Sequence, residues 1–222
     1  MYRICQKRVF SFDMDGTLLP NTSACLEIAR EVGVEKELLE LEASFSNGHI
    51  NTVDFARAIS TLWDSSDGAL MRRVFDSAPK LKGIRDVVKS ISTHGGRTCL
   101  ITLSPQYFAE YFREFGFDEI VASTFPSNSQ QPIRPEDILT PEAKVDRLRS
   151  ICARHDCAFD DVVAFGDSAS DIPLFASIRW SVCLNGTERL RQAAWTCFDG
   201  DNLSCALDHV LLALSTANSA VK

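Results

Sequence analysis

The segment RVFSFDMDGTLL, residues 8–19, sets the architecture expected for this chain. Its first five residues contain one β-branched and two aromatic side chains, and they predict a buried strand. Asp13 and Asp15 follow directly, and Gly16 then allows the backbone a sharp turn. Two carboxylates placed just after a strand can point into a crevice at the sheet edge, one as nucleophile and metal ligand, the other as proton carrier. For this motif alone, an ordinary Asp-Gly turn is the alternative.

The sequence after residue 81 alternates between helical and strand-like patterns. Strands are expected at residues 97–102, 119–123, 161–167, 180–184 and 195–198. Helices are expected at residues 84–94, 106–115, 142–155 and 203–214. This alternation is typical of parallel βαβ units with right-handed crossovers. We therefore expect an α/β fold with a Rossmann-like parallel sheet flanked by helices.

Residues 20–80 have a different pattern. Apolar residues recur there at helical spacing in four stretches, residues 24–33, 35–48, 52–63 and 69–78, with Asn51 or Thr52 placed to cap the third. No strand pattern is visible between them. The sequence thus predicts an α/β core of residues 1–19 and 81–222, with a small all-helical cap of residues 20–80 inserted after the first strand.

The composition limits the classes of partner. The chain has 222 residues, 45% of them hydrophobic and 24% charged, with a net charge of −7, which is ordinary for a globular protein and argues against nucleic acid and anionic membranes. No apolar run approaches the ~20 residues of a membrane span, and residues 1–13 lack the features of a signal peptide. The eight cysteines form no CxxC pair and predict free, buried thiols. A cytoplasmic location is expected.

Other polar side chains are expected at the same sheet edge. Thr102 ends a strand and Ser104 follows it, where free N–H groups can bind an anion; a helix cap is the alternative. Lys144 near a helix start can clamp a phosphate and a carboxylate, or be solvated. Asp167 and Asp171 follow an apolar strand and offer the oxygens that Mg²⁺ prefers, or cap a helix.

In chain order, DMDGTL, Thr102, Lys144 and GDSASD resemble the four motifs of the haloacid dehalogenase superfamily, with a spacing similar to its phosphoserine-phosphatase-like branch. The resemblance extends from residue 9 to about residue 200. It implies a Mg²⁺-dependent phosphatase that acts on phosphate monoesters, because dehalogenases and phosphonatases of the superfamily lack an acid at the position of Asp15. It also implies that the helical insertion is a C1-type cap that closes over the substrate.

The resemblance implies a role for each motif residue. Asp13 would attack phosphorus and form an aspartyl-phosphate, and Asp15 would protonate the leaving alkoxide and then activate water. Phosphoryl oxygens would be bound by Thr102, Lys144, Ser104 and the turn at Gly16. Mg²⁺ would be held by Asp13, the backbone carbonyl of Asp15 and Asp167, with Asp171 in support. A cation near Asp13 would keep it ionised among the other carboxylates.

The substrate is expected to be a small phosphorylated metabolite. Phosphoserine phosphatases carry a cap glutamate at the position that Thr22 occupies here, and the nearest acid is Glu27, so phosphoserine itself is disfavoured. Arg57 is the candidate for a contact with the leaving group, a solvated arginine being the alternative. A cage for a substrate ammonium group would need aromatic residues from the cap, and Phe45, Phe55 and Trp63 are available. Packing in the core is the alternative role for these three side chains.

Two other functions are alternatives on the same scaffold. A phosphomutase or phosphotransferase on the same scaffold would pass the phosphoryl group to another hydroxyl rather than to water. A non-catalytic phosphate-binding protein would require a missing motif residue, and none is missing. The four scattered histidines give poor support for a zinc site. The oligomeric state is not specified by any pattern in the sequence.

Overall fold

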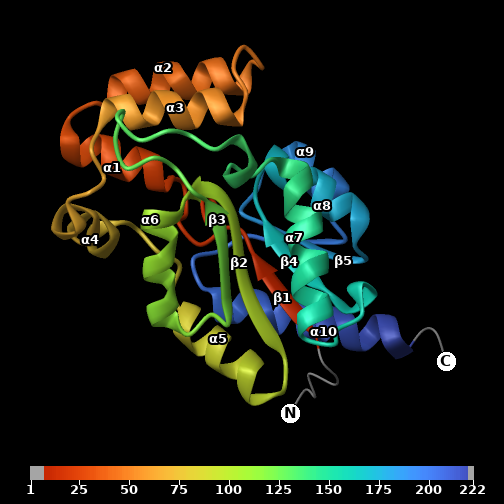
Figure 1. The fold of residues 1–222 in the computed structure, drawn as a ribbon. Helices are drawn as coiled ribbons and strands as arrows, with labels where there is room; N and C mark the ends of the chain where they lie inside the picture. The colour runs from red at the N-terminus through yellow and green to blue at the C-terminus, as the bar shows by residue number, and fades with distance from the viewer. Residues whose placement is uncertain (1–7, 220–222) are drawn as a thin grey trace.

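The computed structural model describes residues 8–219, which form a six-stranded parallel sheet with helices on both faces (Figure 1). The strand order is β3-β2-β1-β4-β5-β6. β1 (Val9–Phe12) lies between β2 (Arg97–Pro105) and β4 (Val163–Gly166). The chain order reverses at β1, and such a switch point is where open α/β sheets bind ligands. The predicted Rossmann-like fold is confirmed. Residues 1–7 lie outside the described residues; they include Cys5 and most of the segment in which a signal peptide was not expected.

The remaining strands extend the sheet on either side of β1. β3 (Glu119–Ser123) pairs with β2, and β5 (Trp180–Leu184) and β6 (Thr196–Phe198) continue from β4. β2 runs three residues further than predicted, to Pro105, with a register shift against β3 after Ile101. The predicted strand end at Thr102 is therefore corrected: Thr102 and Ser104 both lie within β2.

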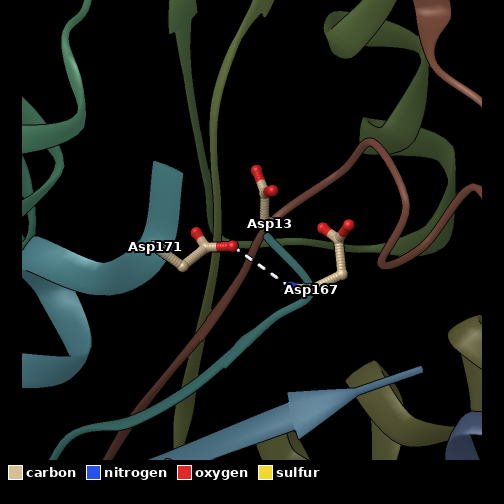
Figure 2. A group of neighbouring side chains, drawn as sticks. All are labelled: Asp13, Asp167 and Asp171. Atoms are coloured by element: carbon tan, nitrogen blue, oxygen red, sulfur yellow. Dashed lines mark hydrogen bonds between the residues drawn. The ribbon is translucent and has the colours of Figure 1, made fainter. Parts of the chain in front are cut away.

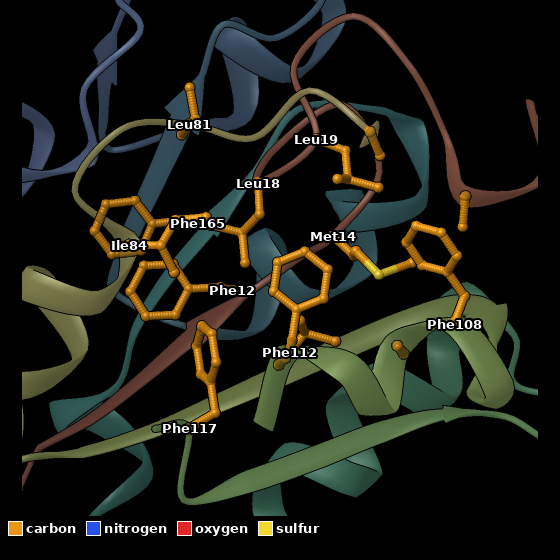
Figure 3. Close-up of a cluster of buried hydrophobic side chains, with 14 of the residues drawn as sticks. Phe12, Met14, Leu18, Leu19, Leu81, Ile84, Phe108, Phe112, Phe117 and Phe165 are labelled. Atoms are coloured by element: carbon orange, nitrogen blue, oxygen red, sulfur yellow. The ribbon is translucent and has the colours of Figure 1, made fainter. Parts of the chain in front are cut away.

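The sheet has an apolar core on each face because its side chains alternate with period two. From β1, Phe10 and Phe12 face α5 (Ile84–Thr93) and α10 (Leu203–Ser219), whereas Val9 faces the opposite layer. That opposite layer consists of α7 (Pro141–Arg154), α8 (Ile172–Ser177) and α9 (Glu188–Ala193). Phe12 stacks on Phe165 of β4, with ring centroids 4.7 Å apart (Figure 3). This packing fixes the ends of β1 and β4, from which the acidic residues emerge.

The helix predicted at residues 106–115 divides into two parts. α6 (Gln106–Ala109) is followed by a 3₁₀ helix, Glu110–Phe115, which ends at the left-handed Gly116. Aromatic side chains from both parts pack on Phe75. The ring centroid of Phe75 is 5.4 Å from that of Phe108 in α6 and 5.2 Å from that of Phe112 in the 3₁₀ helix (Figure 3 labels Phe108 and Phe112). Burial of these rings, rather than helix propensity, determines the local path.

Four helices connect β1 to α5. They are α1 (Ala24–Val32), α2 (Glu35–Ser46), α3 (Thr52–Leu62) and α4 (Gly68–Ser77). α1 starts at Ser23, whose hydroxyl accepts from the N–H of Leu26 at 3.1 Å. α3 starts at Asn51, one of the two caps predicted for it. α2 and α3 pack together as the outermost layer on this side of the molecule (Figure 1).

The cysteines within the described residues are free, as predicted, but not all are buried. Cys25, Cys99, Cys152 and Cys183 are buried, whereas Cys205 is exposed. Within residues 8–219, no helix combines the length and the apolar character needed to cross a membrane.

Candidate active site

Three carboxylates meet at the carboxyl edge of the sheet. Asp13 follows β1, Asp167 follows β4, and Asp171 ends the 3₁₀ turn Ala169–Asp171 (Figure 2). One oxygen from each lies within 4.8 Å of the others. Hard oxygen donors at this spacing suit a divalent cation such as Mg²⁺. The structure thus brings together the side chains of three of the four predicted metal-binding residues.

Backbone contacts hold two of these acids in place. The N–H of Asp13 donates to the carbonyl oxygen of Phe165 at 3.0 Å, which joins the ends of β1 and β4. The Asp171 Oδ2 atom accepts from the N–H of Asp167 at 3.1 Å and from that of Ser168 at 3.4 Å. A Cβ atom at Gly166 would lie 2.4 Å from the Asp171 carboxyl carbon, so a glycine is needed beside this inward-facing acid.

Gly16 makes a second close approach, to Asp167. Its φ of +70° is the left-handed conformation that glycine adopts readily. A Cβ atom there would lie 2.1 Å from Asp167 Oδ2, far inside contact distance. On the other oxygen of the same carboxylate, the hydroxyl of Thr17 donates to Oδ1 at 3.1 Å. The DMDGT loop therefore determines the position of Asp167, although 150 residues separate Thr17 from it.

Lys144 lies beneath the acidic cluster. Its side chain is 1% exposed, which excludes the alternative of a solvated helix lysine. Nζ lies 3.0 Å from Asp13 Oδ1 and 2.7 Å from Asp171 Oδ1. Thr140 caps α7 by accepting from the N–H of Ala143, and the helix then presents Lys144 on its buried face. One ammonium group thus compensates part of the charge of three carboxylates.

The electrostatics of the cluster favour an additional positive charge. Burial, with repulsion from Asp171, raises the pKa of Asp13 well above its ordinary value, and Lys144 opposes the shift. The same two causes raise the pKa of Asp167 to about 7. Burial by itself would lower the pKa of Lys144, but Asp13 and Asp171 outweigh it and the pKa is raised. A divalent cation would relieve the repulsion among the acids, so the donor set fits such an ion.

Asp15 lies in a different environment from Asp13. Its Oδ1 accepts from the N–H of Ala24 at 2.7 Å, and its Oδ2 accepts from the hydroxyls of Ser104 and, at 3.5 Å, Thr102. Burial raises the pKa of Asp15, and the hydrogen bond from Ser104 opposes part of this shift. The side chain of Asp15 is not part of the carboxylate cluster. Ser104 and Thr102, predicted to bind phosphate, here hold this second acid.

A cavity of about 300 Å³ opens above the two acids of the DMDGT loop. Asp13, Asp15 and Thr102 are part of its lining. Residues from α1, α2 and α3 also line it, with Phe125 and Ile138 from the loop after β3; the helix residues are Cys25, Glu42, Phe45, Ser46, Thr52 and Phe55. Glu42, Phe125 and Ile138 line the cavity without having been expected from the sequence. No pattern marked them, because Glu42 looks like any solvated helix glutamate and the other two lie in an irregular loop.

Arg57 does not line this cavity, contrary to its predicted position. Its side chain is 58% exposed and pairs with Asp54 at 2.9 Å. Phe55 lines the cavity, and two residues along a helix correspond to about 200° of rotation, so Arg57 projects away. Glu27 is likewise engaged elsewhere, since it accepts from Thr22 at 2.5 Å and pairs with Arg30.

Comparisons with known proteins show what this chain is similar to. The phosphoserine phosphatase of Archaeoglobus fulgidus is 23% identical over 201 residues, covering 89% of this chain and 58% of that protein. The phosphoserine phosphatase of Methanocaldococcus jannaschii is 22% identical over 208 residues, covering 92% of this chain and 98% of its own. A solved structure described as a phospho-aspartyl intermediate analogue of phosphoserine phosphatase superposes with a TM-score of 0.75 at 21% identity, covering 92% of this chain and 99% of that one.

This chain therefore spans little more than half the length of one of these relatives and nearly all of the other. The relatives support the predicted enzyme class, a hydrolase that acts on phosphoric monoesters. The model of the haloacid dehalogenase-like hydrolase family matches residues 10–176, which include the whole acidic cluster. The chain therefore belongs to the haloacid dehalogenase-like hydrolase family, with phosphoserine phosphatases among its relatives.

Proposed function

We propose that this protein is a Mg²⁺-dependent phosphatase that cleaves small phosphate monoesters through an aspartyl-phosphate on Asp13. The observation that carries the proposal is the contrast between the two acids of the DMDGT loop. Asp13 contacts Lys144 and belongs to the carboxylate cluster, whereas Asp15 is held by hydroxyl and N–H donors outside that cluster. Two carboxylates in one cavity with different surroundings can take different roles in acid–base and nucleophilic chemistry.

Asp13 has the surroundings of a nucleophile. Its side chain is 6% exposed, and it lines the cavity. Burial raises the pKa of Asp13, and Lys144 opposes this shift; a divalent cation bound to the cluster would favour the ionised form further, which has the electron pair needed to attack phosphorus. In this step an Asp13 oxygen forms a bond to phosphorus while the bond from phosphorus to the alcohol oxygen breaks.

Asp15 has the surroundings of a general acid and base. Its raised pKa favours the protonated form, which can give its proton to the departing alkoxide. The resulting carboxylate then accepts a proton from a water molecule, which attacks phosphorus and releases inorganic phosphate from Asp13. In the substrate-free protein, Ser104, Thr102 and the N–H of Ala24 hold the Asp15 side chain aimed at the cavity.

We assign the divalent cation to Asp13, Asp167 and Asp171, with the backbone carbonyl of Asp15 as a further ligand. Such an ion, when bound, would neutralise charge on the phosphoryl oxygens. Lys144 is proposed to supply positive charge from the opposite side, and Thr102, Ser104 and the Gly16 turn to contact phosphoryl oxygens. Because Asp171 already accepts from two N–H groups and Lys144, its first role is to fix that lysine.

We further propose that residues 20–80 act as the cap predicted from the sequence. α2 and α3 contribute Glu42, Phe45, Thr52 and Phe55 to the wall of the cavity that Asp13 and Asp15 also line. A substrate held between these helices and the sheet edge would be shielded from water. We propose a reducing compartment such as the cytoplasm, because the cysteines of the described residues, from Cys25 to Cys205, are free thiols.

The proposal is tested with Asp13→Asn and Asp15→Asn, assayed for release of inorganic phosphate and of the alcohol. We expect Asp13→Asn to lose at least ~10³ of kcat on every ester, because the covalent step is lost. Asp15→Asn should release one equivalent of nitrophenol from p-nitrophenyl phosphate, whose leaving group needs no proton, and then turn over slowly. Excess EDTA should abolish wild-type activity and Mg²⁺ should restore it.

Three results would contradict the proposal. They are near wild-type phosphate release by Asp13→Asn, full activity in excess EDTA, and release of alcohol without inorganic phosphate. The last would instead indicate transfer to a second hydroxyl, as in a phosphotransferase.

A further inference from the structure

We propose that the cavity accepts phosphate esters of a small alcohol that carries an ammonium group and no carboxylate, with Glu42 as the residue that binds the ammonium. The inference rests on the proposed phosphatase function and specifies its substrate class. It follows from the part of the cavity wall that α2, α3 and the loop after β3 form.

Most of this wall is apolar. Phe45 and Phe55 line the cavity together, with ring centroids 5.4 Å apart and planes at 48°. Both rings remain partly exposed, although Phe55 also packs against the buried core. Phe125 and Ile138 add two more apolar side chains from the loop after β3. Aromatic faces attract cations and also contact methylene groups, so this wall suits the carbon chain around an ammonium.

Glu42 is the acid on this wall. It is half-buried, and its Oε1 accepts a long hydrogen bond, 3.5 Å, from the hydroxyl of Ser23. Burial, with repulsion from Asp15, raises the pKa of Glu42. The residues that line the cavity include no lysine or arginine side chain. A half-buried carboxylate with no cation on the same wall is stabilised by a ligand that brings its own positive charge.

The same wall disfavours a carboxylate on the leaving group. Lys144 lies below the cluster, tied to Asp13 and Asp171, and the exposed Arg57 is tied to Asp54. A substrate carboxylate in the cavity would face Glu42 and Asp15 without a cationic partner. Like charges placed together in a binding site cost several kcal/mol, so an amino acid phosphate should be a poor substrate compared with the corresponding amino alcohol phosphate.

The test compares wild type and Glu42→Gln on four esters in Mg²⁺: 2-aminoethyl phosphate, propyl phosphate, O-phosphoserine and p-nitrophenyl phosphate. In wild type, we expect kcat/KM for 2-aminoethyl phosphate to exceed that for propyl phosphate and for phosphoserine by at least about 10-fold each. Glu42→Gln, which keeps the side-chain shape, should lower kcat/KM for the aminoethyl ester by about 10-fold, mainly through KM. Propyl and p-nitrophenyl phosphate should change by less than about twofold.

Arg57→Ala is the matched control on the same helical layer and should leave all four esters unchanged. A wild-type preference for phosphoserine, or equal rates on propyl and aminoethyl esters, would overturn the inference. So would a Glu42→Gln variant that loses activity equally on every ester, since that indicates a structural role. Absence of phosphate release from all four esters by wild type would instead refute the phosphatase function itself, and the inference with it.

Discussion

Replacing Lys144 with methionine tests the electrostatic account of the acidic cluster. Methionine fills a similar volume but removes the ammonium that lies 3.0 Å from Asp13 and 2.7 Å from Asp171. Removing one partner of a buried ion pair typically costs about 3–5 kcal/mol because the other charge is left uncompensated. We expect the free energy of unfolding of the metal-free protein to fall by about this amount at pH 8.

The loss should depend on pH in a definite direction. Lys144 lowers the pKa of both Asp13 and Asp167, so its removal raises these values further above the ordinary value of 3.8. An acid whose pKa is raised in the folded state stabilises the protein below its unfolded pKa, and this contribution is lost as pH rises through the folded pKa. In Lys144→Met the free energy of unfolding therefore continues to fall up to a higher pH than in wild type, by up to ~1.4 kcal/mol per pH unit for each proton released. The difference from wild type should therefore be small at pH 5 and large at pH 8.

Urea unfolding in EDTA, followed by tryptophan fluorescence at pH 5 and pH 8, measures both quantities. Lys82→Met is the control, because Lys82 pairs with Asp201 at 2.6 Å but is 73% exposed. An exposed pair of this kind contributes little, so this variant should unfold much like wild type at both pH values. If Lys144→Met loses the same stability at pH 5 as at pH 8, the effect is one of packing and the electrostatic reasoning is refuted.

Two further predictions concern Gly16 and Asp167. Gly16→Ala and Gly33→Ala both place a side chain at positive φ, +70° and +78°; Gly33→Ala should lose about 1–2 kcal/mol of stability, and Gly16→Ala at least as much. The new Cβ meets Asp167 only in Gly16→Ala, so that variant alone should lose about 10²-fold in kcat/KM; equal activities would contradict the close approach. In the metal-free protein, burial and Asp171 raise the pKa of Asp167 to about 7. Protonated Asp167 therefore stabilises the fold at low pH, and this stabilisation is lost as pH rises from 3.8 through 7. Because the cation needs the ionised carboxylate, Mg²⁺ should raise Tm more at pH 8 than at pH 6 by differential scanning fluorimetry, and an equal rise at both would count against Asp167 as a ligand.

Local patterns in the chain were enough to predict the architecture and the acidic motif residues. The parallel sheet follows from alternating strand and helix patterns, whose periods of 2 and 3.6 residues are local properties. Asp13 and Asp167 could be placed at one sheet edge because the carboxyl ends of parallel strands lie together. Asn51 could be expected at a helix start because its side chain bonds to an N–H three residues away.

Contacts between distant segments required the folded structure. Ser104 donates to Asp15, 89 residues away, although its local sequence was compatible with phosphate binding or helix capping. Glu42 lines the cavity and Arg57 does not, yet both belong to helices with ordinary polar faces. The face of a helix that meets the sheet edge depends on how whole elements pack. The hydrophobic effect is not directional, so the orientation of a helix is determined by all of its tertiary contacts together. The chemistry of the leaving-group wall is therefore a property of the packing of α2 and α3 over β1.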